Sequence, residues 1–458
     1  MRGRDTCGGK PTPSITRASY HWHRGSSLTS EHDCGLWGHS LRDKADTPTL
    51  NSDQTADMVI VGGGFTGCAA ALEAARQGVS VVLVEANAIG FGGSGRNVGL
   101  VNAGLWLPPE TIVAQMGPQA GRRLIRLLAA APDQVFDVIE REGIACEAVR
   151  QGTLHLAHAP AGLRDLQDRH RQAEAFGLRT ELLDAAETRR RTGTDAYHGA
   201  LFHPGAGTVQ PLAYCHGLAR AAMRAGARLF THSPAQAIAR VGAGWQVTAN
   251  GHRITASRLL MAVNAYPQAG AVAQTPRCTP VFFSQFATDP LPEKTLQTLL
   301  PGQEGCWDTG LVMTSVRRDQ AGRLILGTMG NIRGIGGAVH EGWMRRELRR
   351  LYPALADIPF EHAWAGRIAM TRDHVPKIQR LGPNALTVFG YSGRGIGPGT
   401  VFGTAAVRAL LSGDEACLPL PAIAGYSEWL PSARAAVFEA GAIGLHGLRG
   451  RRPVKVGP

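Results

Sequence analysis

The sequence lacks long apolar runs and paired cysteines. No segment has the roughly 18 consecutive uncharged apolar residues that a membrane-spanning helix needs, and the N-terminal region has no apolar core like that of a secretory signal. The eight cysteines are scattered and form no C-x-x-C pair, which argues against a zinc ribbon and against a disulfide framework. We therefore expect a cytoplasmic protein with reduced thiols.

Lysine is also scarce. The net charge of +12 comes mainly from arginine, which stands in short clusters at 122–126 and 189–191. These clusters have no interleaved aromatic residues and no nucleic-acid-binding motif, so we predict a solvated surface and no nucleic-acid partner. The positive charge would still attract small anionic substrates.

The first 56 residues differ from the rest of the chain. With 458 residues, 44% of them hydrophobic, the chain can build a sizeable core and more than one domain. Residues 1–56 show no helical or strand periodicity, and we predict a weakly ordered N-terminal extension there. His21, His23, His32 and Cys34 are metal-ligating residue types, but they lie in this unpatterned segment, so we predict no metal site.

The clearest motif begins at Asp57 and reads "DMVIVGGGFTGCAAALEAARQGVSVVLVEA". It predicts an apolar strand over 58–61, a glycine turn, an alanine-rich helix over about 66–77, and a second apolar strand over 79–84. Gly78 is a suitable C-terminal stop for the helix. This order of elements is a βαβ unit, which is typical of adenine dinucleotide binding.

Gly62, Gly64 and Gly67 fit the pattern G-x-G-x-x-G. The first glycine makes the tight turn, the second lets the backbone approach a pyrophosphate, and the third lets helix and strand pack closely. The helix N-terminus offers free N–H donors to the phosphates. Glu85 ends the second strand, where a carboxylate accepts hydrogen bonds from a ribose hydroxyl and repels the 2′-phosphate of NADP. FAD and NAD both remain open on this motif alone.

Two further glycine-rich loops favour FAD, because a nicotinamide does not need them. The loop "GGSGRNVG" at 92–99 has glycine at four of its eight positions, so a large flat cofactor could approach its backbone. Near the C-terminus, "FGYSGRGIGPGTVFG" predicts a glycine loop followed by a helix over about 401–411, whose N-terminal partial positive charge suits the pyrimidine end of a reduced flavin. An ordinary strand-to-helix turn would need the same glycines for geometry alone.

The remaining patterns predict a second domain. We expect a helical stretch over 121–143 broken near Pro132, helices over about 163–176 and 211–226, a buried strand over 257–266, and a β-rich region over 276–326. The predicted fold class is α/β, a Rossmann-like FAD-binding domain with an inserted α+β substrate domain built on a mixed sheet. We assign 57–150, 205–270 and 365–415 to the FAD-binding domain, 151–204 and 271–364 to the substrate domain, and 416–458 to a C-terminal tail.

Five motifs occur in the order seen in a known superfamily: "VIVGGGFTGCAAA", "GGSGRNVGLVNAG", "AVNAY", "WAGRIAMTRDHVP" and "GYSGRGIGPG". Over these motifs the chain resembles the D-amino-acid oxidase-like superfamily of FAD-dependent oxidoreductases, nearest to the branch with L-pipecolate oxidase and gamma-glutamylputrescine oxidase. The resemblance implies hydride transfer from the carbon next to an amine to FAD, and hydrolysis of the resulting imine. It also implies these cofactor-binding residues: Gly62, Gly64, Phe65, Thr66, Gly67, Glu85, Ala86, Ser94, Gly95, Arg96, Asn97, Gly393, Arg394, Gly395, Ile396 and Thr400.

The chain departs from the residue pattern of the family that it resembles in two places. Many amino-acid oxidases of the superfamily carry a carboxylate-binding arginine where this sequence has Ile368, and Arg367 would point to the other side of an extended strand. Arg317 or Arg394 could take that role, since a guanidinium pairs bidentately with a carboxylate, and Trp106 is a candidate wall of the substrate site. The cysteine that tethers flavin in sarcosine oxidases is not evident, so we expect non-covalent FAD.

Several alternatives stay open on the sequence. No general base stands out and the catalytic residues are unknown, although an amine that arrives neutral needs none. His374 is read as a loop residue. The substrate could instead be a 2-hydroxy acid, or the chain could be a non-catalytic FAD-binding assembly factor. The electron acceptor could be dioxygen or a quinone or other carrier.

Overall fold

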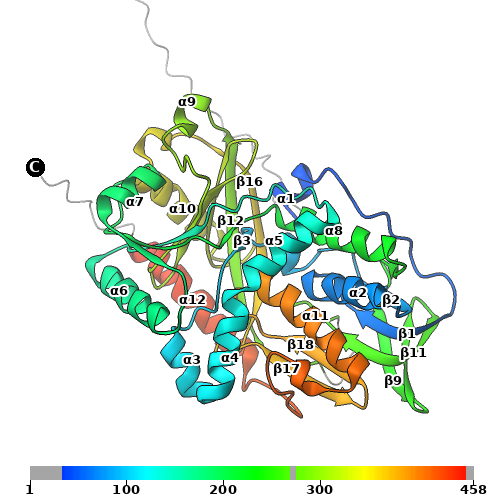
Figure 1. Ribbon diagram of the computed structural model, residues 1–458. Helices are drawn as coiled ribbons and strands as arrows, with labels where there is room; N and C mark the ends of the chain where they lie inside the picture. The colour runs from blue at the N-terminus through cyan, green and yellow to red at the C-terminus, as the bar shows by residue number, and fades with distance from the viewer. Residues whose placement is uncertain (1–33, 269–274, 450–458) are drawn as a thin grey trace, which may run out of the picture.

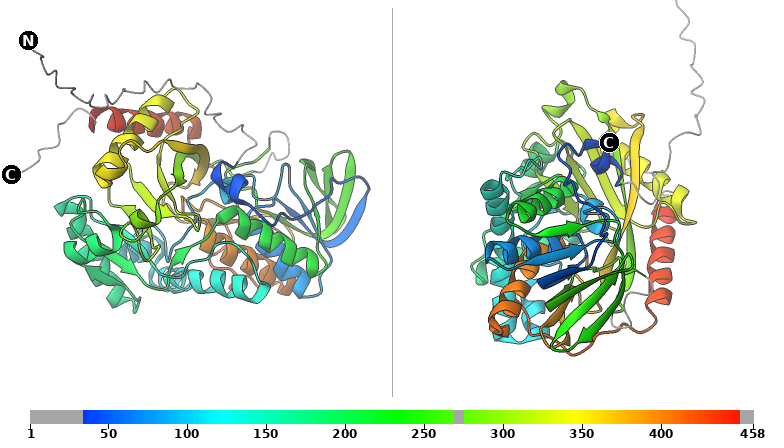
Figure 2. Two further views of the ribbon diagram at one scale, coloured as in Figure 1. Left: turned by 90° about the horizontal axis from the view of Figure 1, so that it is seen from above. Right: turned by 90° about the vertical axis from the view of Figure 1, so that its right-hand side faces the viewer.

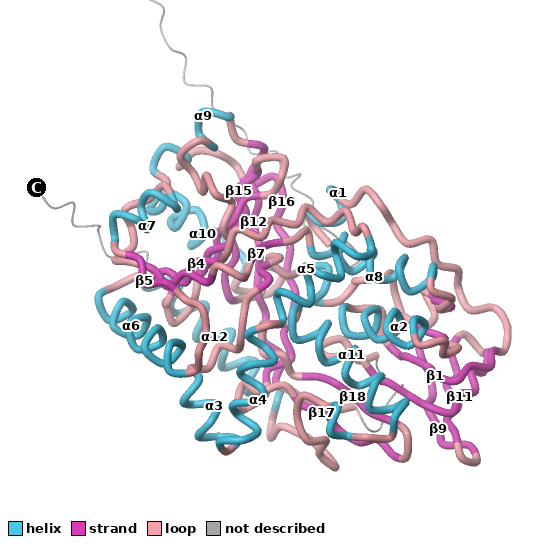
Figure 3. Tube along the Cα trace, in the orientation of Figure 1, coloured by secondary structure: helices cyan, strands magenta, loops and turns pink. Residues whose placement is uncertain are grey.

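Two large sheets organise the molecule. The computed structural model describes residues 34–268 and 275–449, and each sheet has eight strands. Figure 1 shows the first sheet with its helices on the right and the second sheet on the left, while in Figure 3 strands of the first sheet reach the lower right edge of the molecule, with its helices on one side of them. No helix of the described ranges has the length and apolar character required to cross a bilayer.

The first sheet is mainly parallel and contains the predicted βαβ unit. Its strand order is β17-β18-β11-β1-β2-β8, and β10 and β9 continue from β11 as an antiparallel ribbon. The strand bounds are β1 (Gln54–Val61), β2 (Val81–Val84), β8 (Arg228–Phe230), β9 (Ala235–Val241), β10 (Gly244–Ala249), β11 (His252–Met261), β17 (Lys377–Gly382) and β18 (Ala385–Phe389). Because β1, β2, β8, β11 and β18 run parallel, their carboxyl ends meet at one edge.

Alternating side chains of β1 build two cores. Met58 and Ile60 belong to a core under the helices, whereas Val59 and Val61 belong to a core under the β9–β10 ribbon, as expected for a strand buried on both faces. The helices on the first face include α2 (Phe65–Arg76), α5 (Ala131–Glu142), α8 (Pro211–Arg224) and α11 (Ile396–Ser412). The alanines of α2 are small, so α8 and α11 pack closely against it.

The second sheet is mixed, with strand order β16-β12-β15-β14-β13-β4-β6-β5. The bounds are β4 (Thr153–Leu156), β5 (Glu181–Leu183), β6 (Ala200–His203), β12 (Thr279–Pro290), β13 (Gly305–Asp308), β14 (Thr314–Arg318), β15 (Arg323–Met329) and β16 (Phe360–Met370). Only β4 and β13 pair in parallel within it. Helices α10 (Gly337–Leu351) and α12 (Pro431–Arg449) pack together, and α12 lies along β12 (Figure 2).

The other elements connect or flank these sheets. They are α1 (Leu36–Ser40), α3 (Pro109–Met116), α4 (Pro118–Ala129), α6 (Pro160–Ala175), α7 (Ala185–Thr192), α9 (Glu293–Leu296) and the two-residue strands β3 (Leu100–Val101) and β7 (Gly207–Thr208). The predicted break near Pro132 is confirmed: α4 ends at Ala129, and Pro132 lies in the first turn of α5, where its missing N–H is not needed.

The structure corrects the predicted domain ends. Within the supposed extension, Leu36 and Trp37 are 0% exposed, because α1 packs against α8 and β16. A five-residue helix is too short to show periodicity, so no pattern in the sequence indicated it. The histidines at 21, 23 and 32 lie outside the described residues; Cys34 lies inside them and is buried.

Two further boundaries move. Residues from 365 were assigned to the FAD-binding domain, but β16 pairs with β12 along its length to Met370 and therefore belongs to the second sheet. The supposed C-terminal tail includes α12, a 19-residue helix packed on that sheet. Its apolar residues do not gather on one face, since Val437 and Leu448 are exposed, so no periodic pattern marked this helix in the sequence.

Candidate cofactor and substrate site

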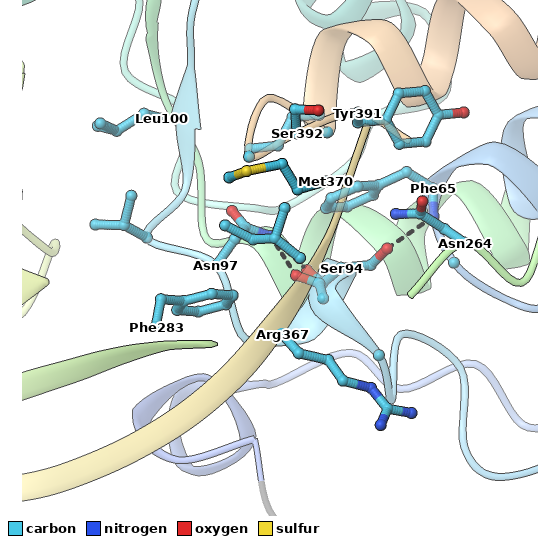
Figure 4. Close-up of a pocket in the computed structure, with 18 of the residues that line it drawn as sticks. Phe65, Ser94, Asn97, Leu100, Asn264, Phe283, Arg367, Met370, Tyr391 and Ser392 are labelled. Carbon is cyan, nitrogen blue, oxygen red and sulfur yellow. Dashed lines mark hydrogen bonds between the residues drawn. The ribbon is translucent and has the colours of Figure 1, made fainter. Parts of the chain in front are cut away.

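One cavity of about 590 Å³ lies between the two sheets. Residues at the carboxyl ends of the first sheet's strands, among them Gly62, Glu85 and Asn264, line it together with side chains of the second sheet. Figure 4 shows this arrangement, with Ser94 and Asn264 on the side of the first sheet and Phe283 of the second sheet in view.

The glycine turn after β1 has no room for side chains. Gly62 has φ +113°, and a Cβ there would lie 2.7 Å from the carbonyl oxygen of Ala262. A Cβ on Gly67 would lie 1.8 Å from the carbonyl oxygen of Gly62, so the helix can approach the turn only through glycine. A Cβ on Gly64 would lie 2.8 Å from Ser94 Oγ. The turn therefore has the geometry expected of a dinucleotide-binding loop.

The loop at 92–99 packs onto this turn. Ser94 Oγ accepts a hydrogen bond from the N–H of Phe65 at 3.0 Å, and Asn97 Nδ2 donates to the carbonyl of Ser94 at 2.9 Å (Figure 4). Thr66 Oγ1 lies 2.7 Å from the hydroxyl of Tyr391, which precedes the C-terminal glycine loop. Two further motifs, one 29 and the other 325 residues away in the sequence, are thus hydrogen-bonded to the glycine turn at the start of α2.

Glu85 is fixed at the end of β2. Its Oε2 accepts from the N–H of Gly63 at 2.7 Å and its Oε1 accepts from the N–H of Asn87 at 2.9 Å. Burial raises the pKa of this carboxyl, while the backbone donors act in the opposite direction. The carboxylate lines the cavity, where a ribose hydroxyl could donate to it.

Eleven of the sixteen predicted cofactor residues line the cavity, namely Gly62, Gly64, Phe65, Thr66, Glu85, Ala86, Ser94, Asn97, Gly393, Gly395 and Ile396. The other five, Gly67, Gly95, Arg96, Arg394 and Thr400, lie behind it. Thr400 Oγ1 lies 3.0 Å from the hydroxyl of Tyr214 and donates to the carbonyl of Ile396. These five positions support the wall and do not form it.

Arg96 supports two aromatic rings of the wall. Its guanidinium lies 4.4 Å from the ring centroid of Phe91 and 5.8 Å from that of Tyr266, and both rings line the cavity. The carbonyl of Arg96 accepts from Trp364 Nε1 at 2.9 Å. The positive charge of this loop therefore acts on the cavity through aromatic faces.

Arg394 is clamped between two tryptophans. Its guanidinium lies 4.8 Å from the ring of Trp106 and 5.1 Å from that of Trp307, and Nη1 donates to the carbonyl of Ala103 at 2.6 Å. Burial lowers the pKa of Arg394 to about 9. Both tryptophans line the cavity, whereas Arg394 does not, so its hypothetical role as a carboxylate clamp is corrected to one of positioning.

Arg317 does not reach the cavity either. It is 1% exposed, and Nη1 donates to the carbonyls of Val209 at 2.6 Å and Val98 at 3.3 Å. Because its guanidinium is held by these backbone oxygens, Arg317 is corrected from a substrate residue to a link between the domains. Arg367 does line the cavity, as does Ile368, but its guanidinium lies over the Tyr266 ring at 4.5 Å.

Most of the second sheet's contribution to the cavity comes from residues that no sequence motif indicated. Met370, Phe283, Gln285, Trp307 and His155 line the cavity from four different strands. Each of them faces the cavity through the ordinary alternation of side chains along a strand, and none belongs to a motif. The only possible signal was therefore which of the two alternating sets of side chains in each strand faces the cavity. Asp165 and Arg169 of α6 also line it, paired at 2.8 Å.

The fold and the cavity are typical of a dinucleotide-binding protein. The second sheet forms the other wall of the cavity, where a substrate could lie. Comparison with known proteins identifies the family: the DAO family model, described as FAD dependent oxidoreductase, matches residues 57–409. The chain belongs to this family of FAD-dependent oxidoreductases, and its cofactor is FAD.

Two relatives match most of the chain. A probable oxidoreductase OrdL of Rhizobium meliloti is 31% identical over 360 residues, which is 76% of this chain and 81% of the relative. The gamma-glutamylputrescine oxidoreductase of Escherichia coli is 29% identical over 377 residues, 80% of this chain and 86% of the relative. Among solved structures, glycine oxidase from Geobacillus kaustophilus has a TM-score of 0.65 at 21% identity, covering 79% of this chain and 96% of that one, a likeness of fold.

Proposed function

We propose that this enzyme oxidises the carbon–nitrogen bond of an amine, or of an amino or imino acid, to an imine. The observation that carries the proposal is the continuous cavity that reaches from the carboxylate of Glu85 to the aromatic and polar wall of the second sheet. The similarity to a gamma-glutamylputrescine oxidoreductase supports an amine substrate of that kind, and a pipecolate-like imino acid is the second form of the same proposal.

FAD supplies the acceptor for a hydride, that is, one hydrogen nucleus with two electrons. The carbon next to the nitrogen loses this hydride, and the nitrogen lone pair forms the new C=N bond. Loss of the N–H proton then gives the neutral imine, which water hydrolyses to a carbonyl compound and ammonia, or to a carbonyl compound and an amine where the substrate nitrogen carries a second carbon. The chain's residues contribute binding and orientation, and a neutral amine requires no strong base among them.

The cofactor contacts are part of this proposal. Gly62, Gly64 and the start of α2 would bind the pyrophosphate, and Glu85 the ribose. Ser94 and Asn97 would lie beside the flavin. The loop of Gly393, Gly395 and Ile396 would lie at its pyrimidine end, where the partial positive charge at the N-terminus of α11 favours a reduced, anionic ring. Binding without a covalent tether remains our expectation.

The arginines near the cavity are engaged to different degrees. Arg169 is paired with Asp165, and Arg317 and Arg394 are held behind the wall. Arg367 lines the cavity and lies over the Tyr266 ring, but its Nε is buried without a hydrogen-bond partner among the described residues. The proposed amine can therefore carry a polar group or a carboxylate that meets this guanidinium.

An anaerobic reduction screen tests the proposal. The holoenzyme would be mixed with gamma-glutamylputrescine, acetylputrescine, pipecolate, proline, sarcosine and glycine, and flavin absorbance followed. Bleaching by at least one of them, with release of an aldehyde, a keto acid or ammonia, supports amine oxidation. Bleaching only by 2-hydroxy acids, with formation of a keto acid and no release of ammonia or an aldehyde, would replace it with hydroxy-acid oxidation. The same reduced enzyme, exposed to dioxygen or to a soluble quinone, would identify the acceptor.

A further inference from the structure

One row across the second sheet presents a pair of neutral polar groups to the cavity. In the strand register, Gln285 of β12 lies opposite Gly327 of β15, and Gly327 lies opposite Ser315 of β14. The row continues from Ser315 to Trp307 and from Trp307 to His155. All five residues line the cavity. Residues in one row stand side by side on the same face, so this row forms a continuous strip of the wall.

Glycine in the middle of this row creates the space between the two polar groups. A Cβ on Gly327 would lie 2.3 Å from Gln285 Oε1 and 2.5 Å from Ser315 Oγ. Glycine inside a strand weakens it and often marks a place where another group approaches closely. Here the approaching groups are an amide and a hydroxyl, which converge on one point of the wall.

The amide of Gln285 has an acceptor that no described residue satisfies. Gln285 is 4% exposed, and its Oε1 is buried without a hydrogen-bond partner among residues 34–268 and 275–449. A buried acceptor of this kind costs free energy unless a ligand or water completes it. The residue lines the cavity, so a rotation of its carboxamide group can present this oxygen to a donor on a bound substrate.

We infer that the carboxamide oxygen of Gln285, assisted by the hydroxyl of Ser315, accepts a hydrogen bond from the N–H group of the substrate amine. The inference rests on the proposed function and names the residues that would recognise its reacting nitrogen. A carboxamide oxygen accepts a hydrogen bond from an amine without a full charge that would favour the ammonium form. Since hydride departs only from a neutral amine, a neutral acceptor suits the reaction better than a carboxylate would.

The charged and titratable groups around the cavity leave this function to the neutral pair. They are Glu85, His155, Asp165, Arg169, Asp308, Arg367 and His374, with Tyr266 and Tyr391. Asp165 pairs with Arg169, and Oδ1 of Asp308 accepts from the N–H groups of Gly310 and Thr314. His155 is stacked on Trp307 with ring centroids 5.0 Å apart, and burial holds the pKa of this imidazole well below its usual value.

The first test compares Gln285→Leu with Gln379→Leu. Gln379 of β17 also has a buried Oε1 without a partner among the described residues, but it does not line the cavity, so it controls for removing such an amide. We expect Gln285→Leu to raise the Kd for gamma-glutamylputrescine, measured by anaerobic titration of the flavin spectrum, roughly five- to tenfold. FAD content should be unchanged in both variants. An equal Kd in wild type and Gln285→Leu would overturn the inference.

The second test uses Gln285→Glu, which changes charge with little change in shape. A carboxylate would hold the amine as an ammonium, so the pH at which flavin reduction reaches half its maximal rate should rise. A pH profile that does not move would overturn the inference. Complete loss of binding would also overturn it, because a carboxylate repels a substrate carboxylate and the amide would then have served that group. The proposed function fails separately, if no amine reduces the wild-type flavin.

Discussion

Gly67→Ala tests the close packing of α2 against the glycine turn. The new Cβ would lie 1.8 Å from the carbonyl oxygen of Gly62 and 3.5 Å from Ile60 Cγ2. Since non-bonded heavy atoms rest about 3.5 Å apart, the helix or the turn must shift by more than about 1 Å. Alanine favours a helix over glycine by about 1 kcal/mol. The clash should outweigh this gain, because forcing a methyl group into a packed core costs about 1–3 kcal/mol.

The matched control is Gly444→Ala in α12. Gly444 is also helical, but nothing lies within 4 Å of a Cβ built on it. We expect Gly444→Ala to leave the melting temperature unchanged or raise it. Gly67→Ala should lower it by several degrees, since about 1 kcal/mol shifts a domain of ordinary size by about 2–4 °C. The variant should also lose FAD during gel filtration, because the displaced carbonyl belongs to the turn that we propose binds the pyrophosphate. A Gly67→Ala protein as stable and as yellow as the control would refute the packing argument.

Three other changes probe the walls of the site. Arg96→Ala should weaken FAD retention, because the guanidinium supports Phe91 and Tyr266; full FAD occupancy after gel filtration would contradict this. Arg394→Lys should destabilise the protein by about 1–2 kcal/mol in urea, since an ammonium cannot stack between two indoles. Burial raises the pKa of Asp308 to about 6 in the folded protein, so folding stability should decrease as pH rises from 4 to 6, and Asp308→Asn should remove that decrease; the same slope in the variant would count against it.

The cofactor half of the site was predictable because its requirements act on neighbouring residues. A turn that must approach a pyrophosphate needs glycines at fixed spacing. The acidic residue that accepts a hydrogen bond from the ribose stands at the end of the second strand, whose length is also fixed. Gly62, Gly64 and Glu85 therefore stand in one short stretch, and the structure brings all three to the cavity. The family resemblance extended this to Ser94 and the Gly393 loop. Their contact with the turn could not come from spacing alone.

The arginines show where sequence reasoning failed. Arg317 and Arg394 were chosen because a guanidinium suits a carboxylate, yet each is already engaged by backbone carbonyls. In both cases the decisive partners, Val209 and Ala103, are more than 100 residues away in the chain and act through main-chain oxygens. Backbone acceptors have no residue identity, so no pattern of side chains could have indicated them.

The substrate wall was hidden for a related reason, and this has a consequence for specificity. His155, Gln285, Ser315 and Gly327 are brought into one row only by the register of five strands. A shift of one residue in any of these pairings would turn that strand's contribution away from the cavity. The residues proposed to recognise the substrate are therefore set by sheet pairing, whereas those proposed to bind FAD are set by local motifs. On this proposal, a change of substrate can arise by substitutions along the row, without altering the glycine turns.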